Sequence, residues 1–160
     1  MLSITKADDI VLARAGNCIS PPAVRAEFDF DKPQEVFSFV RVYLADGIPM
    51  MTSKSFLPIE TADLMEKKNF AAKNFLQVLS QKLGKKIDQC DQQIDAILAE
   101  PSMAEFLEVS PGTPLLSVRM TARDQNNFAA IHCHTLIRTD RGKLNVSMGW
   151  NNDQQNWQMR

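Results

Sequence analysis

Residues 37–58 read FSFVRVYLADGIPMMTSKSFLP, and this stretch decides the fold. Its first half is dense in β-branched and aromatic residues, which favour strands. Asp46-Gly47 followed by further strand formers is typical of a tight turn between antiparallel strands, in which glycine adopts a positive φ. The stretch therefore predicts a hairpin with strands 36–45 and 48–57. Since side chains alternate along a strand, one face of the first strand is expected to carry Phe37, Phe39, Arg41 and Tyr43.

The hairpin and the residues that lead into it recur later in the chain. Residues 26–46, AEFDFDKPQEVFSFVRVYLAD, align without a gap on residues 104–124, AEFLEVSPGTPLLSVRMTARD. In this alignment Arg41 falls on Arg119 and Asp46 falls on Asp124. The shared order of short helix, proline turn, strand and hairpin predicts two pseudo-repeated hairpin units.

The remaining segments predict helices between the strands. Residues 87–100 show a two-residue period that favours a strand, although their composition also permits a helix. A last edge strand is expected at 143–148, and the polar tail from Gly149 is expected to be loose. The sum is an α+β fold, an antiparallel sheet of about six strands with helices packed on it. Its other expected elements are a strand at 10–13, helices at 23–29, 60–67, 69–83 and 102–108, and strands at 115–122 and 128–138.

Length and composition indicate one globular domain, residues 1–160. The chain has 160 residues, of which 44% are hydrophobic and 23% are charged, and no linker is long enough to divide it. Its three cysteines show no CxxC spacing, and the N-terminus lacks the features of a signal peptide, so a cytoplasmic location without a membrane partner is expected. The net charge of −1 and the scattered basic residues argue against DNA binding by this chain alone.

Arg41 is the leading candidate for ligand binding. Phe39 and Tyr43 flank it on the same strand face, so its guanidinium group is expected to be partly desolvated. A guanidinium fork in such a place pairs best with a planar or tetrahedral oxyanion. The alternatives are an arginine lying along an exposed sheet face or an internal pair with a carboxylate.

The two histidines, His132 and His134, share a strand face at a spacing that metal sites use. No third ligand can be identified, so we expect no metal, and His132 is interpreted as a hydrogen-bonding residue of the pocket. No GxSxG, HExxH or glycine-rich phosphate loop is present, and Ser53 beside Lys54 does not indicate a nucleophile. We therefore expect no catalytic residue and no cofactor.

An ordered set of short motifs spread from Pro22 to Val146 resembles the UTRA domain. This is the effector-binding domain of the HutC branch of GntR-type bacterial transcription regulators. No single motif is specific, but their order is. The motifs are Arg41-x-x-x-Ala45-Asp46-Gly47-x-Pro49, Phe56-Leu57-Pro58, LGKKI at 83–87, Ile94-Asp-Ala96, Phe106-Leu107-x-Val109-x-Pro111-Gly112-x-Pro114-Leu115-Leu116 and Ile137-Arg138-x-Asp140-Arg141.

The resemblance implies a chorismate lyase-like fold with a pocket between the sheet and neighbouring helices, and a homodimer. It also implies a small anionic metabolite as ligand, such as a phosphorylated sugar or a carboxylate. Family members contact DNA through a winged helix-turn-helix domain, and residues 1–160 are expected to contain none. The chain is then either an excised sensor domain or a stand-alone ligand-binding protein; a lyase-like enzyme is the remaining alternative.

The resemblance also places Arg41 on the first arginine of the family's Arg-x-Arg-x-Ala-Asp-Gly strand, which holds the effector's anionic group. This chain departs from the pattern at Tyr43, where a second arginine is frequent, and at Ser53, where a glutamate is frequent. An aromatic or carboxylic effector therefore fits as well as a sugar phosphate. Arg138 either adds positive potential at the pocket mouth or pins the chain end to the sheet. The expected ligand-binding residues are Arg41, Tyr43, Ser53, His132, His134 and Arg138.

Overall fold

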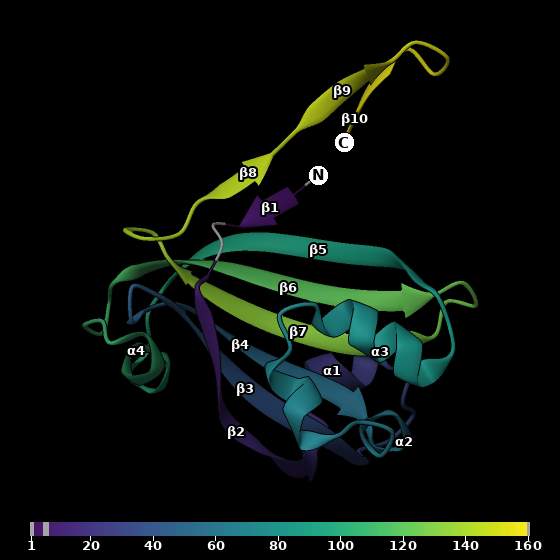
Figure 1. Ribbon diagram of the computed structural model, residues 1–160, viewed down its shortest axis with the longest axis horizontal. Coiled ribbons are helices and arrows are strands. Elements are labelled where there is room, and N and C mark those ends of the chain that lie inside the picture. The colour runs from purple at the N-terminus through teal and green to yellow at the C-terminus, as the bar shows by residue number, and fades with distance from the viewer. Residues whose placement is uncertain (1, 5–6, 160) are drawn as a thin grey trace.

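A six-stranded antiparallel sheet forms the centre of the structure, a computed structural model that describes residues 2–4 and 7–159. The strand order is β2-β3-β4-β7-β6-β5, so the two hairpins meet at the central pair β4 and β7 (Figure 1). This arrangement confirms the predicted α+β class and the predicted strand at 87–100. The strands are β2 (Asp9–Ile19), β3 (Glu35–Ala45), β4 (Ile48–Pro58), β5 (Ile87–Leu98), β6 (Pro114–Asp124) and β7 (Ala129–Arg138).

The two hairpins close with different turns. Asp46 and Gly47 join β3 to β4 with φ values of 52° and 72°, the left-handed conformations that a two-residue turn requires. The turn between β6 and β7 is longer, and the Asp124 carboxylate accepts the backbone N–H groups of Asn126 and Phe128, both at 2.9 Å. Each hairpin is thus fixed by local chemistry that is visible in the sequence.

The strand register assigns the side chains to the two faces of the sheet. Directly paired residues share a face, and Arg41 pairs with Ser53, which pairs with Thr135. We call this side the aromatic face because it also carries Phe39 and Tyr43. The opposite side is called the groove face, and it carries Val40, Lys54 and His134.

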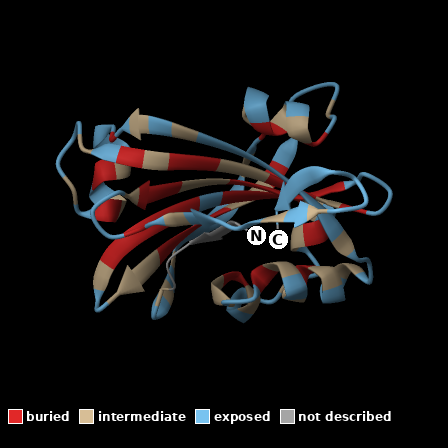
Figure 2. Ribbon diagram, turned by 90° about the horizontal axis from the view of Figure 1, so that it is seen from above, coloured by how far each residue is buried: buried red, intermediate tan, exposed pale blue. Residues whose placement is uncertain are grey.

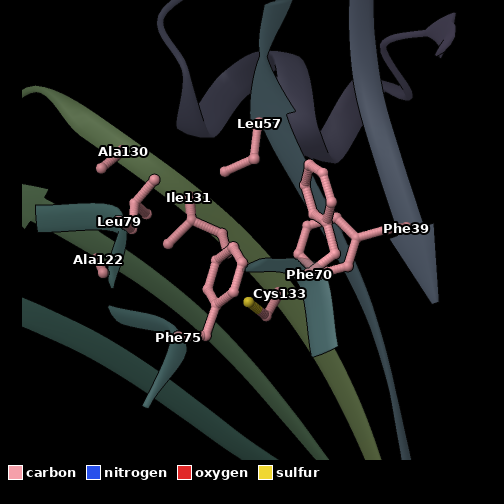
Figure 3. Packing of buried hydrophobic residues seen from close by; sticks show 9 residues of the cluster. All are labelled: Phe39, Leu57, Phe70, Phe75, Leu79, Ala122, Ala130, Ile131 and Cys133. Carbon is pink, nitrogen blue, oxygen red and sulfur yellow. The ribbon is translucent and has the colours of Figure 1, made fainter. Parts of the chain in front are cut away.

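The aromatic face is covered by η1 (Lys67–Ala71) and α3 (Phe75–Leu83). Figure 3 shows the rings of Phe39, Phe70 and Phe75 gathered beside Cys133, with ring centroids 5.0 Å apart for Phe39 and Phe70 and 5.2 Å apart for Phe39 and Phe75. Leu79 of α3 is fully buried in the same cluster. Burial of such large apolar side chains is the main favourable contribution to folding.

The groove face carries the two short helices that precede the hairpins, α1 (Pro22–Glu27) and α4 (Pro101–Leu107). Val24 of α1 packs with Val36 and Phe56, and Leu107 of α4 packs with Leu115. Figure 2 shows the buried residues concentrated along the strands and on the inner sides of the helices. Each face of the sheet is therefore covered in part by its own set of helices.

The helical segment between the hairpins differs from the prediction. The helix expected at 60–67 is one turn, α2 (Ile59–Ala62), and the helix expected at 69–83 begins only at Phe75. Between them, the backbone N–H of Glu66 donates to the Asn69 side chain at 2.7 Å and starts the 3₁₀ helix η1. This break turns Phe70 into the aromatic cluster, a tertiary contact that overrides local helix propensity.

The two ends of the chain also differ from the prediction. β2 is longer than the strand expected at 10–13, and β8 (Leu144–Val146) pairs with β1 (Leu2–Ile4) outside the main sheet. The tail is not loose: β9 (Met148–Asn151) and β10 (Asn156–Met159) form a hairpin that projects from the body (Figure 1). Asn151 supplies the turn, since its side-chain oxygen accepts the N–H groups of Asp153 and Gln154.

Candidate functional site

The candidate site centres on Arg41, in the middle of β3 on the aromatic face. Its side chain is only 7% exposed. The guanidinium carbon lies over three rings, at 4.9 Å from the centroid of Phe75, 5.2 Å from Tyr43 and 5.6 Å from Phe39. The structure therefore confirms that Phe39 and Tyr43 flank Arg41, as strand alternation predicted. The third ring, Phe75 of α3, was not identified from the sequence pattern.

The charge of Arg41 lacks a matching carboxylate in the described part of the chain. Its Nη1 donates to the backbone oxygen of Ala72 at 3.3 Å, while its Nε is buried without a hydrogen-bond partner there. None of the ion pairs formed by residues 7–159 includes it. A buried cation without a counter-charge is costly, so this position is electrostatically prepared for an anion.

Neutral polar groups lie around Arg41 on the same face. Ser53, its cross-strand partner, accepts a hydrogen bond from Thr135 Oγ1 at 3.1 Å, and its Oγ lies 3.5 Å from that of Ser55. The Ser55 hydroxyl donates to Cys133 Sγ at 3.3 Å. Burial raises the pKa of the Cys133 thiol, so it remains protonated at neutral pH. The floor beside Arg41 is therefore a row of uncharged hydroxyl and thiol groups.

Tyr43 lies next to Arg41 on β3 and borders the same region. Burial raises the pKa of its hydroxyl, and the positive charge of Arg41 only partly opposes that shift. Tyr43 is thus a neutral hydrogen-bonding group at pH 7. The structure brings three of the six predicted residues together: Arg41, Tyr43 and Ser53.

The structure separates the two histidines from Arg41. His132 pairs with Phe56 and His134 pairs with Lys54, which places both rings on the groove face. The expectation that His132 shapes one pocket together with Arg41 is therefore wrong. The sheet lies between them, because the register of β7 on β4 puts Ile131, Cys133 and Thr135 on the aromatic face instead.

His132 belongs to a hydrogen-bond chain that runs from the buried ring to the partly exposed Glu27. Thr121 Oγ1 donates to Glu27 Oε2 at 2.7 Å and lies 2.9 Å from His132 Nδ1. The Thr121 hydroxyl has one proton, which it donates to Glu27. His132 Nδ1 therefore carries the ring proton and donates to Thr121. Burial lowers the pKa of His132, and the charge of Glu27 opposes this shift. The ring is a neutral structural link between α1 and the sheet.

His134 has a similar structural partner. Its Nε2 lies 2.8 Å from the Ser117 hydroxyl across the strand. Burial lowers the pKa of His134, and the nearby Arg119 charge lowers it further. Within residues 7–159 no three His, Cys, Asp or Glu side chains are grouped as a metal site would require.

Arg138 is engaged at the end of β7. Its guanidinium group forms a two-point contact with Asp140 at 3.0 and 2.7 Å, and its Nη1 donates to the backbone oxygen of Leu107 at 3.2 Å. A weaker contact reaches the backbone oxygen of Pro49 at 3.4 Å. These contacts favour the structural alternative, in which Arg138 pins the chain end to α4 and β4; a ligand-binding role remains a prediction.

Sequence reasoning missed the basic and aromatic residues that face a groove on the other side of the sheet. Arg14 lies on β2 with its guanidinium 5.1 Å from the centroid of Phe106 on α4. The repeat could have indicated Phe106, because the gap-free alignment places Phe28 on it. Arg14 was missed because the predicted first strand ended before it.

Comparisons with known proteins agree with this architecture. Residues 10–143 match the family described as UTRA domain. The HTH-type transcriptional repressor NagR of Bacillus subtilis is 27% identical over 109 residues, which make up 68% of this chain and 44% of NagR. The chain thus spans less than half of the length of that relative.

Two solved structures show the same fold. A GntR-family transcriptional regulator from Enterococcus faecalis has a TM-score of 0.80 at 20% identity, over 86% of this chain and 99% of that chain. The C-terminal domain of the histidine utilization repressor from Pseudomonas syringae has a TM-score of 0.78 at 18% identity, over 88% and 98%. With the family match over most of its length, the chain belongs to the UTRA domain family, the effector-binding regulatory domains of GntR-type transcriptional regulators.

Proposed function

We propose that this domain senses a small anionic metabolite, which Arg41 holds through its guanidinium group. The observation that carries the proposal is the buried, unpaired charge of Arg41, 7% exposed and without a carboxylate partner among the described residues. An incoming oxyanion would supply the missing counter-charge and occupy the free Nε donor. A charge-assisted hydrogen bond of this kind is stronger than one between neutral groups.

The surroundings of Arg41 indicate the chemistry of the ligand. Three rings and a row of neutral hydroxyls surround a single guanidinium, so one anionic group on a planar or apolar body fits well. Ser53 and Tyr43 are the expected hydrogen-bonding partners of the ligand's neutral atoms. We expect a carboxylate to bind better than a doubly charged phosphate, because only one cation balances its charge.

Ligand binding at Arg41 is expected to change the conformation at the start of α3. In the present state Arg41 donates to the backbone oxygen of Ala72, which lies between η1 and α3, and Phe75 covers the guanidinium. An anion on Arg41 would compete with both contacts and displace the start of α3. A ligand that interacts differently with two states shifts the population between them. We propose that this displacement controls DNA binding by an attached or partner winged helix-turn-helix domain.

The first experiment is a thermal-shift screen of metabolites followed by calorimetry with each hit. A ligand that binds only the folded state at one hundred times its dissociation constant stabilises it by about 2.7 kcal/mol. Arg41→Met is expected to weaken the effector by about ten- to hundredfold, which corresponds to ~1.5–3 kcal/mol. Because methionine keeps an unbranched apolar side chain among the rings, the variant is expected to fold.

Arg119→Met is the matched control, since Arg119 is the counterpart of Arg41 in the repeat but pairs with Asp95 on the other face. This control is expected to bind the effector as the unchanged domain does. If Arg41→Met folds and retains full affinity, or if Arg119→Met causes the larger loss, Arg41 is structural and the proposal fails.

We infer that the domain has no catalytic activity, because its relatives are transcription regulators and the described residues place no carboxylate against Arg41. The lyase alternative requires such a carboxylate beside the arginine. Incubation with chorismate and measurement of product absorbance tests this inference. Turnover that disappears in Arg41→Met would overturn it.

We further propose that the domain acts in the cytoplasm as a homodimer. Several large apolar side chains of the projecting β9–β10 hairpin are exposed, among them Trp157 at 61% and Met159 at 67%. Exposed apolar clusters mark interaction surfaces, and symmetric homodimers are the commonest assemblies. Sedimentation at high micromolar concentration tests this, and a strictly monomeric mass would contradict it. None of the helices in residues 7–159 is long and apolar enough to cross a membrane.

A further inference from the structure

The groove face holds a cavity of about 810 Å³ that is separate from Arg41. Strands β2, β3, β4 and β7 form its floor, and α4 forms one wall. Because the sheet separates the two regions, a ligand in this groove does not touch Arg41. Its lining includes Arg14, Val40, Lys54, Met103, Phe106 and His134.

The charges around the groove favour an anion. Arg14 and Lys54 both line it, and neither takes part in an ion pair with the described residues. Glu105 is the one carboxylate among the described lining residues. With His134 neutral, the lining carries a net positive charge even though the whole chain has a net charge of −1.

Apolar side chains form part of the floor and of the wall of the groove. Val40 is a buried residue of the floor, while Met103 and Phe106 of α4 form the wall. Arg14 is stacked over Phe106, with 5.1 Å between the guanidinium carbon and the ring centroid. Lys54 Nζ is 5.4 Å from the centroid of the Phe56 ring. Each of the two exposed cations thus lies beside an aromatic ring.

We propose that this groove is a second ligand site, for a small carboxylate with a flat apolar body. The volume lies within the range of ligand sites, about 300–1,000 Å³, which are mostly apolar with a few placed polar groups. Arg14 and Lys54 bind the carboxylate, Phe106 and Met103 contact the body, and Val40 forms the base. The site lies on the face opposite to that of Arg41, so the domain can hold two anionic ligands at once.

The test uses 1-naphthoate as the probe and 1-naphthalenemethanol as its neutral counterpart, with binding measured by calorimetry. The carboxylate is expected to bind at least tenfold more tightly than the alcohol. Arg14→Gln and Lys54→Gln are each expected to weaken 1-naphthoate by about five- to twentyfold, with little change for the alcohol. Thermal unfolding of each variant checks that it is folded.

Two control variants distinguish binding of the probe in the groove from binding elsewhere on the domain. Lys86→Gln removes an exposed cation outside the groove and is expected to leave binding unchanged. Arg41→Met tests whether the probe binds on the aromatic face instead, independently of the proposed effector. The proposal is overturned if Arg41→Met weakens 1-naphthoate while Arg14→Gln does not, or if the alcohol binds as tightly as the carboxylate.

Chemical-shift mapping provides a second readout that does not depend on the variants. Addition of 1-naphthoate is expected to shift the ring signals of Phe106 and His134, and any shift of Phe75 would report separate binding at Arg41. Shifts confined to Trp150 and Trp157 would show binding to the projecting hairpin, and the groove assignment would then be wrong.

Discussion

The two hairpin units share a sequence pattern, but corresponding side chains point to opposite faces of the sheet. Arg41 and Arg119 occupy the same place in the repeat. Arg41 pairs with Ser53 on the aromatic face, whereas Arg119 pairs with His134 on the groove face. The Arg119 side chain is 42% exposed and forms an ion pair with Asp95 at 2.9 Å. The comparison teaches that one residue of register decides whether an arginine is a buried ligand-binding candidate or a surface charge.

The one-residue difference is already present at the helix of each unit, since α1 begins at Pro22 and α4 at Pro101, 79 positions apart, whereas the gap-free alignment has an offset of 78. Val36 packs with Val24 of α1, and Leu115 packs with Leu107 of α4, so these two residues have equivalent places. The gap-free alignment instead pairs Val36 with Pro114. Relative to that alignment the second unit is therefore displaced by one residue, and each position of its first strand faces the opposite way from the residue it is aligned with.

The largest expected effect tests this displacement directly. Leu115 is 1% exposed, and Leu115→Ala is expected to reduce the free energy of unfolding by about 2–5 kcal/mol. Pro114 is exposed, and Pro114→Ala is expected to change the free energy of unfolding by no more than about 1 kcal/mol. Urea denaturation measures both. Equal losses would mean that Pro114 carries the contact and that the units correspond without displacement.

The turns of the two hairpins give a second contrast. Gly47 has a φ of 72°, so Gly47→Ala is expected to cost about 1–2 kcal/mol of unfolding free energy. The corresponding left-handed residue of the second turn is Asn127, with a φ of 63°. Asn127→Gly is expected to change stability by only a few tenths of a kcal/mol, because both residues adopt this conformation readily. A neutral Gly47→Ala variant would contradict the assigned turn.

A smaller effect should follow from pH, since only the second unit carries histidines. Burial lowers the pKa of His132 and His134, so both rings favour the neutral form in the folded state. Their contribution to stability is present above the unfolded pKa near 6.5 and is lost as the pH falls through the lower folded values. The melting temperature should therefore fall more between pH 7.5 and 5.5 in the unchanged domain than in His134→Gln. Equal falls would show that His134 does not titrate differently on folding.

The smallest effect is expected at Arg119. Its ion pair with Asp95 joins two side chains that are 42% and 40% exposed, so solvent screens most of the attraction. Arg119→Gln should change the free energy of unfolding by less than about 0.5 kcal/mol in a denaturant titration. A loss above about 1 kcal/mol would mean that the Arg119 ion pair contributes to stability despite its exposure to solvent.

Much of the fold was predictable because its signals are local. The turn at Asp46-Gly47, the alternation of β3 and the two-residue period of β5 follow from short-range preferences, and the structure confirms all three. The same alternation predicted the environment of Arg41 between Phe39 and Tyr43. These inferences needed only the geometry of one strand.

The rest of the site depended on contacts between distant segments. Phe75 covers Arg41 only because η1 interrupts the predicted helix and directs Phe70 into the core. The faces of His132 and His134 depend on how β7 pairs with β4, which alternation within one strand does not define. The groove beside Arg14 exists because α4 packs near β2, far away in the sequence.

By itself, the sequence determined the hairpins, the α+β class and the family resemblance, and it indicated Arg41 as the candidate for binding an anion. Those features follow from residue preferences over a few neighbouring positions and from the ordered motifs. The tertiary structure decided which face each strand of the second unit presents, and so it divided the predicted residues between two separate regions. The physical reason is that side chains alternate with a period of two, so a one-residue displacement of a strand leaves its local pattern intact and turns that pattern to the opposite face.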